Sequence, residues 1–279
     1  MEGGTLVTLH IYDDLVQRTE EWFAVRRGIV TASVVGQLIT TQRPSALDYT
    51  CLKCQRNPGN ACVSTALGKP RIPLQKPHGE RSALASEQPP RLAVADTETS
   101  RGLTLALAAE RITDHTDSTY VSYDMARGIE DEPRAVSVYS EHFAPVETTG
   151  FMVRDFEPGF SIGYSPDGLV GDDGLIEVKS RQQRRHLGTI LDGEIPAENM
   201  AQIQCGLLVS DRSWCDYVSY CGGMRLWRRR VEPDPLWHEV ILAAVAQFET
   251  AAAAMVAAYL EATDGMPDTK RAPEMELVI

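Results

Sequence analysis

The sequence predicts an α/β fold, because short segments with the alternating apolar residues of strands are interleaved with segments that have helical spacing. Strand patterns occur at 151–153, 160–163 and 214–220, and helical patterns occur at 103–112 and after Asp234. A chain of 279 residues is also long enough to bury a substantial core. One main domain with a single insertion is therefore the expected plan.

The chain is acidic overall. It has 27 Lys and Arg residues against 39 Asp and Glu, a net charge of -12. This balance argues against a protein that coats DNA with its whole surface, so any nucleic-acid path must be locally basic. Two groups of arginines are candidates for phosphate contacts. They are Arg181, Arg184 and Arg185, and Arg225, Arg228, Arg229 and Arg230.

No apolar stretch combines the length and the freedom from charge that a membrane span needs, and the segment from Met1 to Leu15 lacks the features of a signal peptide. We therefore expect a cytoplasmic protein without membrane contact. In a reducing compartment, the six cysteines are better interpreted as thiols or metal ligands than as a disulfide framework.

The first element expected is a helix after Thr31. Thr31 is a candidate N-cap, and the apolar face of the helix would comprise Val34, Val35, Leu38 and Ile39. A helix N-terminus that carries two hydroxyls, beside an arginine, can bind a phosphate. An ordinary capped helix with a surface arginine is the alternative.

Residues 49–90 interrupt this pattern and are rich in Pro, Gly and Arg. Cys51 and Cys54 form a Cys-x-x-Cys pair, and Cys62 with His78 completes a tetrahedral Cys₃His set. The segment has few large apolar residues, so a structural Zn²⁺ would supply the missing folding energy. It also resembles short zinc-binding segments of phage and actinobacterial proteins. A flexible insertion with free thiols is the alternative.

An iron–sulfur cluster is a second alternative, because it takes four cysteines. Cys205, Cys215 or Cys221 would then have to join the first three from a distance. These three lie in predicted helix and strand positions, where small buried cysteines are common.

Two helices are expected before the central strands. Residues 103–112 are apolar at helical spacing and should pack against the first helix. A second helix should begin near Pro133, which suits a first turn, and should bury Val136, Tyr139 and Phe143. Glu130 and Asp131 are expected to be solvated or to lie near the start of this helix.

The next elements are neighbouring strands at 151–153 and 160–163, expected to form the sheet that carries Asp167, and a hairpin between Asp167 and Glu177. Asp173-Gly174, flanked by apolar residues, predicts a two-residue turn. Alternate residues of a strand share a face, so Glu177 and Lys179 should point the same way.

This hairpin has the composition of a hydrolytic metal site. The two carboxylates and the carbonyl oxygen of Val178 suit Mg²⁺ or Mn²⁺, which take oxygen ligands. A lysine beside a metal-bound water can orient or deprotonate it, and phosphodiester hydrolysis uses such groupings. A surface hairpin whose Glu and Lys merely pair with strand neighbours is the alternative.

The last elements expected are a helix opened by Pro196, an alternating strand at 214–220 and a long helix that begins at Asp234-Pro235 and extends towards residue 265. The stripe of the long helix comprises Trp237, Ile241, Ala244 and Phe248. Residues 267–279 are expected to form a mobile tail.

Four of these segments, in the same order, resemble motifs of the lambda exonuclease and YqaJ-type viral recombinase family of PD-(D/E)xK nucleases. They are Glu21–Ser33, Gly128–Val136, Ser165–Lys179 and Met200–Gln204. The family often places Cys-Pro after its lysine, whereas this chain has Ser180-Arg181. The resemblance implies a restriction-endonuclease-like core, a central mixed sheet flanked by helices, formed by residues 1–48 and 91–279, with 49–90 as a small zinc-binding insertion.

The resemblance further implies a Mg²⁺-dependent 5′→3′ exonuclease that acts on double-stranded DNA ends in recombination. Asp167, Glu177, the Val178 carbonyl and Glu132 would hold the metal, and Lys179 and Gln202 would position the attacking water. Arg26, Ser33, Ser165 and Thr31 would hold the terminal 5′-phosphate. A ring-shaped trimer and a phage single-strand annealing protein as partner are implied as well. A structure-specific endonuclease and a non-catalytic zinc DNA-binding module are the alternatives.

Overall fold

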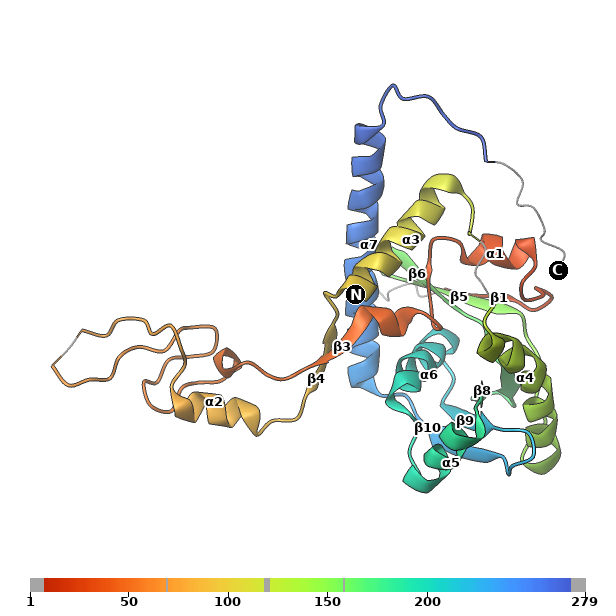
Figure 1. Cartoon of the computed structure of the whole chain (residues 1–279), viewed down its shortest axis with the longest axis horizontal. Coiled ribbons are helices and arrows are strands. Elements are labelled where there is room, and N and C mark those ends of the chain that lie inside the picture. The colour runs from red at the N-terminus through yellow and green to blue at the C-terminus, as the bar shows by residue number, and fades with distance from the viewer. Residues whose placement is uncertain (1–7, 69, 118–120, 158, 272–279) are drawn as a thin grey trace, which may run out of the picture.

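The computed structural model describes residues 8–271 apart from residues 69, 118–120 and 158. It confirms the α/β class, with strands and helices that alternate along most of the chain. Figure 1 shows a body built from sheets and covering helices, and an arm that projects away from it. The tail expected at 267–279 lies largely outside the described residues.

The strands of the body form two mixed four-stranded sheets rather than one central sheet. In spatial order, the first comprises β1 (Leu9–Tyr12), β5 (Phe151–Phe156), β6 (Phe160–Tyr164) and β2 (Val30–Thr31). The second comprises β10 (Trp227–Val231), β9 (Trp214–Tyr220), β8 (Gly174–Ser180) and β7 (Gly168–Val170). Asp167 lies in the link between β6 and β7, so the expectation that the sheet of residues 151–163 carries it was wrong.

The hairpin of β7 and β8 is confirmed, with a turn one residue longer than expected. Val170 pairs with Gly174, so the loop comprises Gly171, Asp172 and Asp173. Gly171 has a φ of 54°, a left-handed conformation that glycine adopts without steric cost. β8 then runs parallel to β9, with Glu177 opposite Tyr217. A neighbour on each side holds β8 in the interior of its sheet.

Helices surround both sheets and leave a main core between them. They are α1 (Glu20–Arg26), α3 (Glu98–Thr113), α4 (Tyr123–His142), α5 (Gln183–Asp192), α6 (Ala197–Ser210) and α7 (Pro235–Ala262). The core includes Leu107 of α3, Ile203 of α6 and Ile241 of α7, all buried. A second, smaller core packs Ala135 and Tyr139 of α4 against β7, β8 and β9.

The long last helix begins as predicted, with Asp234 as its N-cap and Pro235 in its first turn. By length and composition alone α7 could cross a membrane, contrary to the expectation that no such stretch exists. One face of it packs in the main core through Ile241, Val245 and Phe248, as the core helix of a globular protein does.

Two helix predictions were wrong in detail. The helix expected after Thr31 is only a single 3-10 turn, η1 (Val35–Leu38), and Thr31 instead ends β2, which pairs in parallel with β6. Val35 and Leu38 are nevertheless buried, and α3 packs on η1 as expected. α4 begins at Tyr123, ten residues before Pro133, because Ser122 caps it.

The segment predicted to bind zinc, residues 49–90, lies in the arm. A two-stranded ladder of β3 (Ile39–Gln42) and β4 (Arg91–Val94) joins it to the body. Between these strands lie a short 3-10 turn, η2 (Ala46–Asp48), and α2 (Gly79–Ser86). The arm projects to one side of the body in Figure 1. Its division from the body at residues 49 and 90 stays a prediction.

Candidate active site

Asp167 and β8 meet through a hydrogen bond that closes the hairpin. The backbone N–H of Val178 donates to Oδ2 of Asp167 at 2.6 Å. The Val178 side chain is buried in the smaller core, as predicted. The contact seen is thus made by the amide of Val178, and the role of its carbonyl as a metal ligand stays a prediction.

Glu177, Lys179 and Gln202 form one connected polar chain. Lys179 Nζ donates to Glu177 Oε1 at 2.6 Å and to Gln202 Oε1 at 3.0 Å. Glu177 and Lys179 therefore share a face of β8, as the strand period predicts, and Gln202 reaches them from α6. An ammonium group has three donors, so Lys179 retains one N–H for a further acceptor.

The carboxylates of the site repel one another. Burial, together with the charges of Glu177 and Glu132, holds the pKa of Asp167 well above its usual range. Burial and the charge of Glu177 also raise the pKa of Glu132. Burial lowers the pKa of Lys179, but Glu177 and Asp167 more than offset this, so that its pKa is raised and it is a stable ammonium.

These features fit a divalent metal ion. Glu177 is fully buried, and its Oε2 atom has no hydrogen-bond partner within the described structure. A buried charged oxygen without a partner is costly, and a cation would relieve that cost and the repulsion between the carboxylates. Oxygen donors of this kind suit Mg²⁺ or Mn²⁺. The oxygens of Glu132, Asp167 and Glu177 do not all lie within 4.8 Å of one another in the part of the chain described.

Glu132 reaches the site from α4, which is fixed to β8 by the residues beside it. Ser180 Oγ donates to Asp131 Oδ2 at 2.7 Å. Arg134 donates to the other oxygen of Asp131. The expectation that Asp131 is solvated was wrong, because only 8% of its surface is exposed. The Ser180 found in place of the family's usual cysteine thus joins the helix that carries Glu132 to the strand that carries Lys179.

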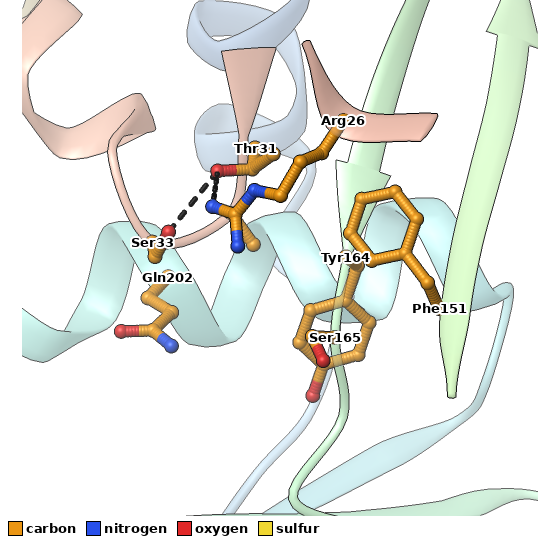
Figure 2. A pocket seen from close by; sticks show the side chains of 8 residues that line it. Arg26, Thr31, Ser33, Phe151, Tyr164, Ser165 and Gln202 are labelled. Carbon is orange, nitrogen blue, oxygen red and sulfur yellow. Dashed lines mark hydrogen bonds between the residues drawn. The ribbon is translucent and has the colours of Figure 1, made fainter. Parts of the chain in front are cut away.

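A small pocket lies beside the hydrogen-bonded side chains of Glu177, Lys179 and Gln202. It brings together side chains from four parts of the sequence (Figure 2). Its empty volume is about 220 Å³ when the open solvent at its mouth is included. All four residues expected to hold a phosphate line it, together with Gln202. The lining is Arg26, Thr31, Ala32, Ser33, Phe151, Tyr164, Ser165 and Gln202. Gln202 therefore connects the pocket to the lysine of the metal site.

Arg26 is the cation of this pocket. Its guanidinium carbon lies 3.8 Å from the centre of the Trp22 ring, a cation–π contact, and one of its nitrogens donates to Thr31 Oγ1 at 3.4 Å. Burial lowers the pKa of Arg26 to about 10. No carboxylate is hydrogen-bonded to it among the residues described, so its charge is available to an anion. Arg27, the next residue, is instead bound to Glu20 and Asp114.

The two hydroxyl groups expected at the start of the helix after Thr31 lie close together, although that helix does not form. Thr31 Oγ1 and Ser33 Oγ are 3.0 Å apart (Figure 2). Thr31 is buried in β2, whereas Ser33 is exposed. The anion-binding potential therefore comes from hydroxyls and a guanidinium rather than from the N-terminus of a helix.

Ser165 is held by two partners, one of which was not foreseen. Its hydroxyl donates to the carbonyl of Gly150 at 3.2 Å and accepts from the Gln17 side chain at 2.9 Å. The hydroxyl would have to rotate away from Gly150 to donate to a phosphate. Gln17 is separated from Ser165 by 148 positions, and no local pattern could reveal such a contact.

The arginine groups singled out in the sequence are mostly engaged within the protein. Arg228 and Arg230 both bind the buried carboxylate of Asp216, and Arg229 binds Glu194. Arg181 donates to Tyr217 at 3.2 Å and to Asn199. These four side chains support strands and helices, and their role in phosphate contacts stays a prediction.

The arm gathers the four predicted ligands of its metal site. The ligand atoms of Cys51, Cys54, Cys62 and His78 all lie within 4.8 Å of one another. Cys51 Sγ is 3.3 Å from His78 Nδ1. Burial opposes ionisation of Cys54, but backbone N–H groups of Val63 and Arg56 and the neighbouring side chains lower its pKa to about 6. A thiolate of this kind is a zinc ligand.

Arg81 balances the charge of this group. Three thiolates and a neutral histidine around Zn²⁺ would carry one net negative charge. Arg81 is fully buried, with a nitrogen 3.5 Å from Cys62 Sγ, and it donates to backbone carbonyls of the arm. These carbonyls belong to Leu47, Tyr49, Asn57 and Asn60. A buried guanidinium that has no carboxylate partner among the described residues thus fits a metal-bound cluster of thiolates.

The cysteines needed for an iron–sulfur cluster lie elsewhere. Cys205 and Cys215 are buried in the main core of the body, and Cys221 follows β9. Histidine occupies the fourth position of the arm cluster. The donor set therefore fits Zn²⁺ better than a four-cysteine cluster.

Comparisons with known proteins confirm the expected resemblance. Residues 85–213 match the YqaJ-like viral recombinase domain. The chain is similar to the solved structure of an alkaline exonuclease, LHK-Exo, from Laribacter hongkongensis, at 25% identity and a TM-score of 0.63. The match covers 89% of this chain and all of that one. A structure of LHK-Exo in complex with dAMP matches at 25% identity over the same shares, with a TM-score of 0.62. No protein with curated annotation matches the chain.

Proposed function

We propose, from the match of residues 85–213 to the YqaJ-like viral recombinase domain and from the likeness to an alkaline exonuclease, that this chain is a metal-dependent 5′→3′ exonuclease. It would digest double-stranded DNA from its ends in phage recombination. The observation that carries this proposal is the position of Gln202, which belongs both to the carboxylate site and to the pocket of Arg26. Gln202 is hydrogen-bonded to Lys179 of the carboxylate site and also lines the pocket of Arg26.

Different residues of the site would have different roles in the reaction. Asp167 and Glu177, with Glu132 and the Val178 carbonyl, would hold Mg²⁺ or Mn²⁺, which would supply Lewis-acid charge at the scissile phosphate. Lys179, a protonated donor with one N–H to spare, would orient the attacking water and stabilise negative charge as the P–O bond breaks. Gln202 would fix the position of Lys179.

The pocket would set the register of the substrate. A terminal 5′-phosphate carries more negative charge than an internal phosphodiester, and Arg26 with the hydroxyls of Thr31, Ser33 and Ser165 offers donors for it. A strand anchored there would present its first phosphodiester to the metal-bound carboxylates. This placement would yield 5′→3′ digestion and would require a free end.

Two further parts of the proposal concern the rest of the protein. Cys51, Cys54, Cys62 and His78 would hold a structural Zn²⁺ in an inserted domain. The resemblance to viral recombinases suggests a homo-oligomer, a ring-shaped trimer, that acts with a phage single-strand annealing protein in the cytoplasm of the bacterial host.

The test is digestion of end-labelled linear duplexes with and without a 5′-phosphate, in Mg²⁺ or with Mg²⁺ omitted, beside a closed circular duplex. The expected result is Mg²⁺-dependent mononucleotide release from the phosphorylated linear duplex and an intact circle. Cleavage of the circle would instead indicate an endonuclease that uses the same carboxylates. Binding without any cleavage would indicate a non-catalytic DNA-binding protein.

A further inference from the structure

The arm is basic in a chain that is otherwise strongly acidic. Residues 49–90 contain six Lys and Arg against two Glu, a net charge of +4. The whole chain has a net charge of -12, so the remaining residues sum to -16. Such segregation of charge is the pattern expected of a surface that binds a polyanion.

The basic side chains of the arm are mostly free. Arg56, Arg71 and Lys76 are exposed and take part in no ion pair or side-chain hydrogen bond among the residues described. Lys53 has one distant partner, Glu80, at 3.6 Å. Arg228, Arg229 and Arg230 of the body are, by contrast, all bound to carboxylates. Exposed cations without a hydrogen-bonded or ion-pair partner among the described residues therefore lie on the arm, and on the body they include Arg184 and Arg185 of α5.

Hydrogen bonds and a buried cluster link separate segments of the arm. The guanidinium of Arg81 donates to backbone carbonyls that precede Cys51 and to others between Cys54 and Cys62, at distances from 2.7 to 3.4 Å. Cys51, Cys54, Cys62 and Val63 form a small buried cluster of their own. A backbone tied together in this way limits the conformational entropy lost when a partner binds.

Chain continuity relates the arm to the phosphate pocket. Ser33 lines the pocket, and only the single turn of η1 separates it from β3, the strand that leads into the arm. The arm then projects from the body (Figure 1). A duplex whose end lies at the pocket would be close to the base of the arm.

We propose that the arm is a second DNA-binding surface, which contacts phosphates of the duplex away from the catalytic site through Arg56, Arg71 and Lys76. This inference rests on the proposed function for the identity of its ligand. Exposed apolar side chains on the arm, Leu52, Leu67 and Ile72, would also suit a protein partner. The excess of free cations favours the DNA backbone over such a partner, because sequence-independent DNA affinity comes mainly from phosphate neutralisation.

The test compares the full-length wild-type protein with the triple variant Arg56→Gln, Arg71→Gln and Lys76→Gln. The matched control is Arg101→Gln, Lys270→Gln and Arg271→Gln, which removes the same charge from the exposed surface of the body. Binding of fluorescein-labelled duplexes of about 10 and about 40 base pairs is measured by anisotropy without added divalent metal, at several salt concentrations. Zinc content and thermal unfolding show that each variant retains the fold of the arm.

We expect the arm variant to bind the long duplex about tenfold or more weakly, and the slope of log K against log salt to fall by about 2 to 3. Affinity for the short duplex should change less, and the body control should bind as the wild type does. Unchanged affinity and salt slope for the long duplex would overturn the inference and leave a protein partner for the arm.

Nuclease assays on the same proteins separate this inference from the proposed function. Arm-dependent binding without digestion of any duplex would contradict the exonuclease and leave the arm as a DNA-binding surface. Mg²⁺-dependent digestion by the wild type, with no effect of the arm variant on binding, would contradict the arm inference alone.

Discussion

Lys179 is the residue on which the proposed chemistry depends most directly. Two of its N–H groups are hydrogen-bonded to Glu177 and Gln202. These two bonds fix the orientation of the ammonium group and therefore the direction of its third N–H. The charge of Glu177 also keeps it protonated. This combination favours a donor that orients water over a base that accepts a proton.

Replacement of Lys179 by Ala should reduce kcat by about 10² to 10⁴, because the positioned donor is lost while the carboxylates remain. Gln202→Ala should have a smaller effect, about tenfold, since Glu177 still holds the lysine. Single-turnover digestion of a phosphorylated duplex measures both rates. Lys270→Ala, a substitution of an exposed lysine near the C-terminus, is the control. Undiminished digestion by the Lys179 variant would place the chemistry elsewhere.

Arg26 and Arg27 provide a matched pair for the phosphate pocket. Arg26→Gln should abolish most of the preference for 5′-phosphorylated over 5′-hydroxyl ends, because it removes the guanidinium found among the described residues that line the pocket. Arg27→Gln should retain the preference, because Arg27 is bound to Glu20 and Asp114 and does not line the pocket. The measurement is the ratio of kcat/KM for the two kinds of end. An equal loss of preference in both variants would argue against a specific role for Arg26.

At the scale of elements, the contact between α4 and β8 determines where Glu132 lies. Asp131 accepts from Ser180, and each of these residues is next to a proposed catalytic residue. This hydrogen bond joins the neighbours of Glu132 and Lys179, and it adds to the bond from Arg127 Nε to Ser180 Oγ at 3.1 Å and to the core packing of α4 on β8.

Ser180→Ala should lower the free energy of unfolding by about 1–3 kcal/mol, because the buried carboxylate of Asp131 loses a hydrogen bond. It should also raise the Mg²⁺ concentration needed for half-maximal digestion, since Glu132 is less well positioned. Ser137→Ala, an exposed position on the same helix, should change stability by less than about 0.5 kcal/mol. Urea unfolding and a Mg²⁺ titration test this. Lower stability with an unchanged Mg²⁺ requirement would restrict the bond to a structural role.

Local signals explain which elements could be predicted from the sequence. The β7–β8 hairpin has a turn-forming Gly171-Asp172-Asp173 segment, and α7 has a capping aspartate followed by proline, so both were confirmed. The helix after Thr31 was wrong because β2 is formed by pairing with β6, more than 130 positions away. The start of α4 was missed because Pro133, typical of a first turn, lies inside the helix.

The same distinction applies to the candidate site. Asp167, Glu177 and Lys179 were recognisable because one hairpin carries them, and Gln202 only through the family resemblance. Gln17 could not be found, because its contact with Ser165 is made only in the folded protein. Asp131 could not be distinguished from a solvated acid, since its burial depends on Ser180 of another element.

At the scale of the whole molecule, the arm and the body have different sources of stability. The body has a main core assembled from both sheets and several helices, whereas the buried cluster of the arm comprises three cysteines and Val63. A cluster this small cannot offset the conformational entropy of about forty residues, so the arm should depend on its metal.

Loss of zinc should therefore unfold the arm and leave the body folded. Cys62→Ser removes one ligand, and we expect zinc content to fall from one ion per chain towards none, with hydrogen exchange accelerated within residues 49–90 only. Cys221→Ser, at a buried cysteine of the body outside the metal cluster, should retain the zinc. Metal analysis and exchange mass spectrometry distinguish the two variants. Exchange that also accelerates in β8 and α4 would show that the arm and the body unfold together, and a division at residues 49 and 90 would then be untenable.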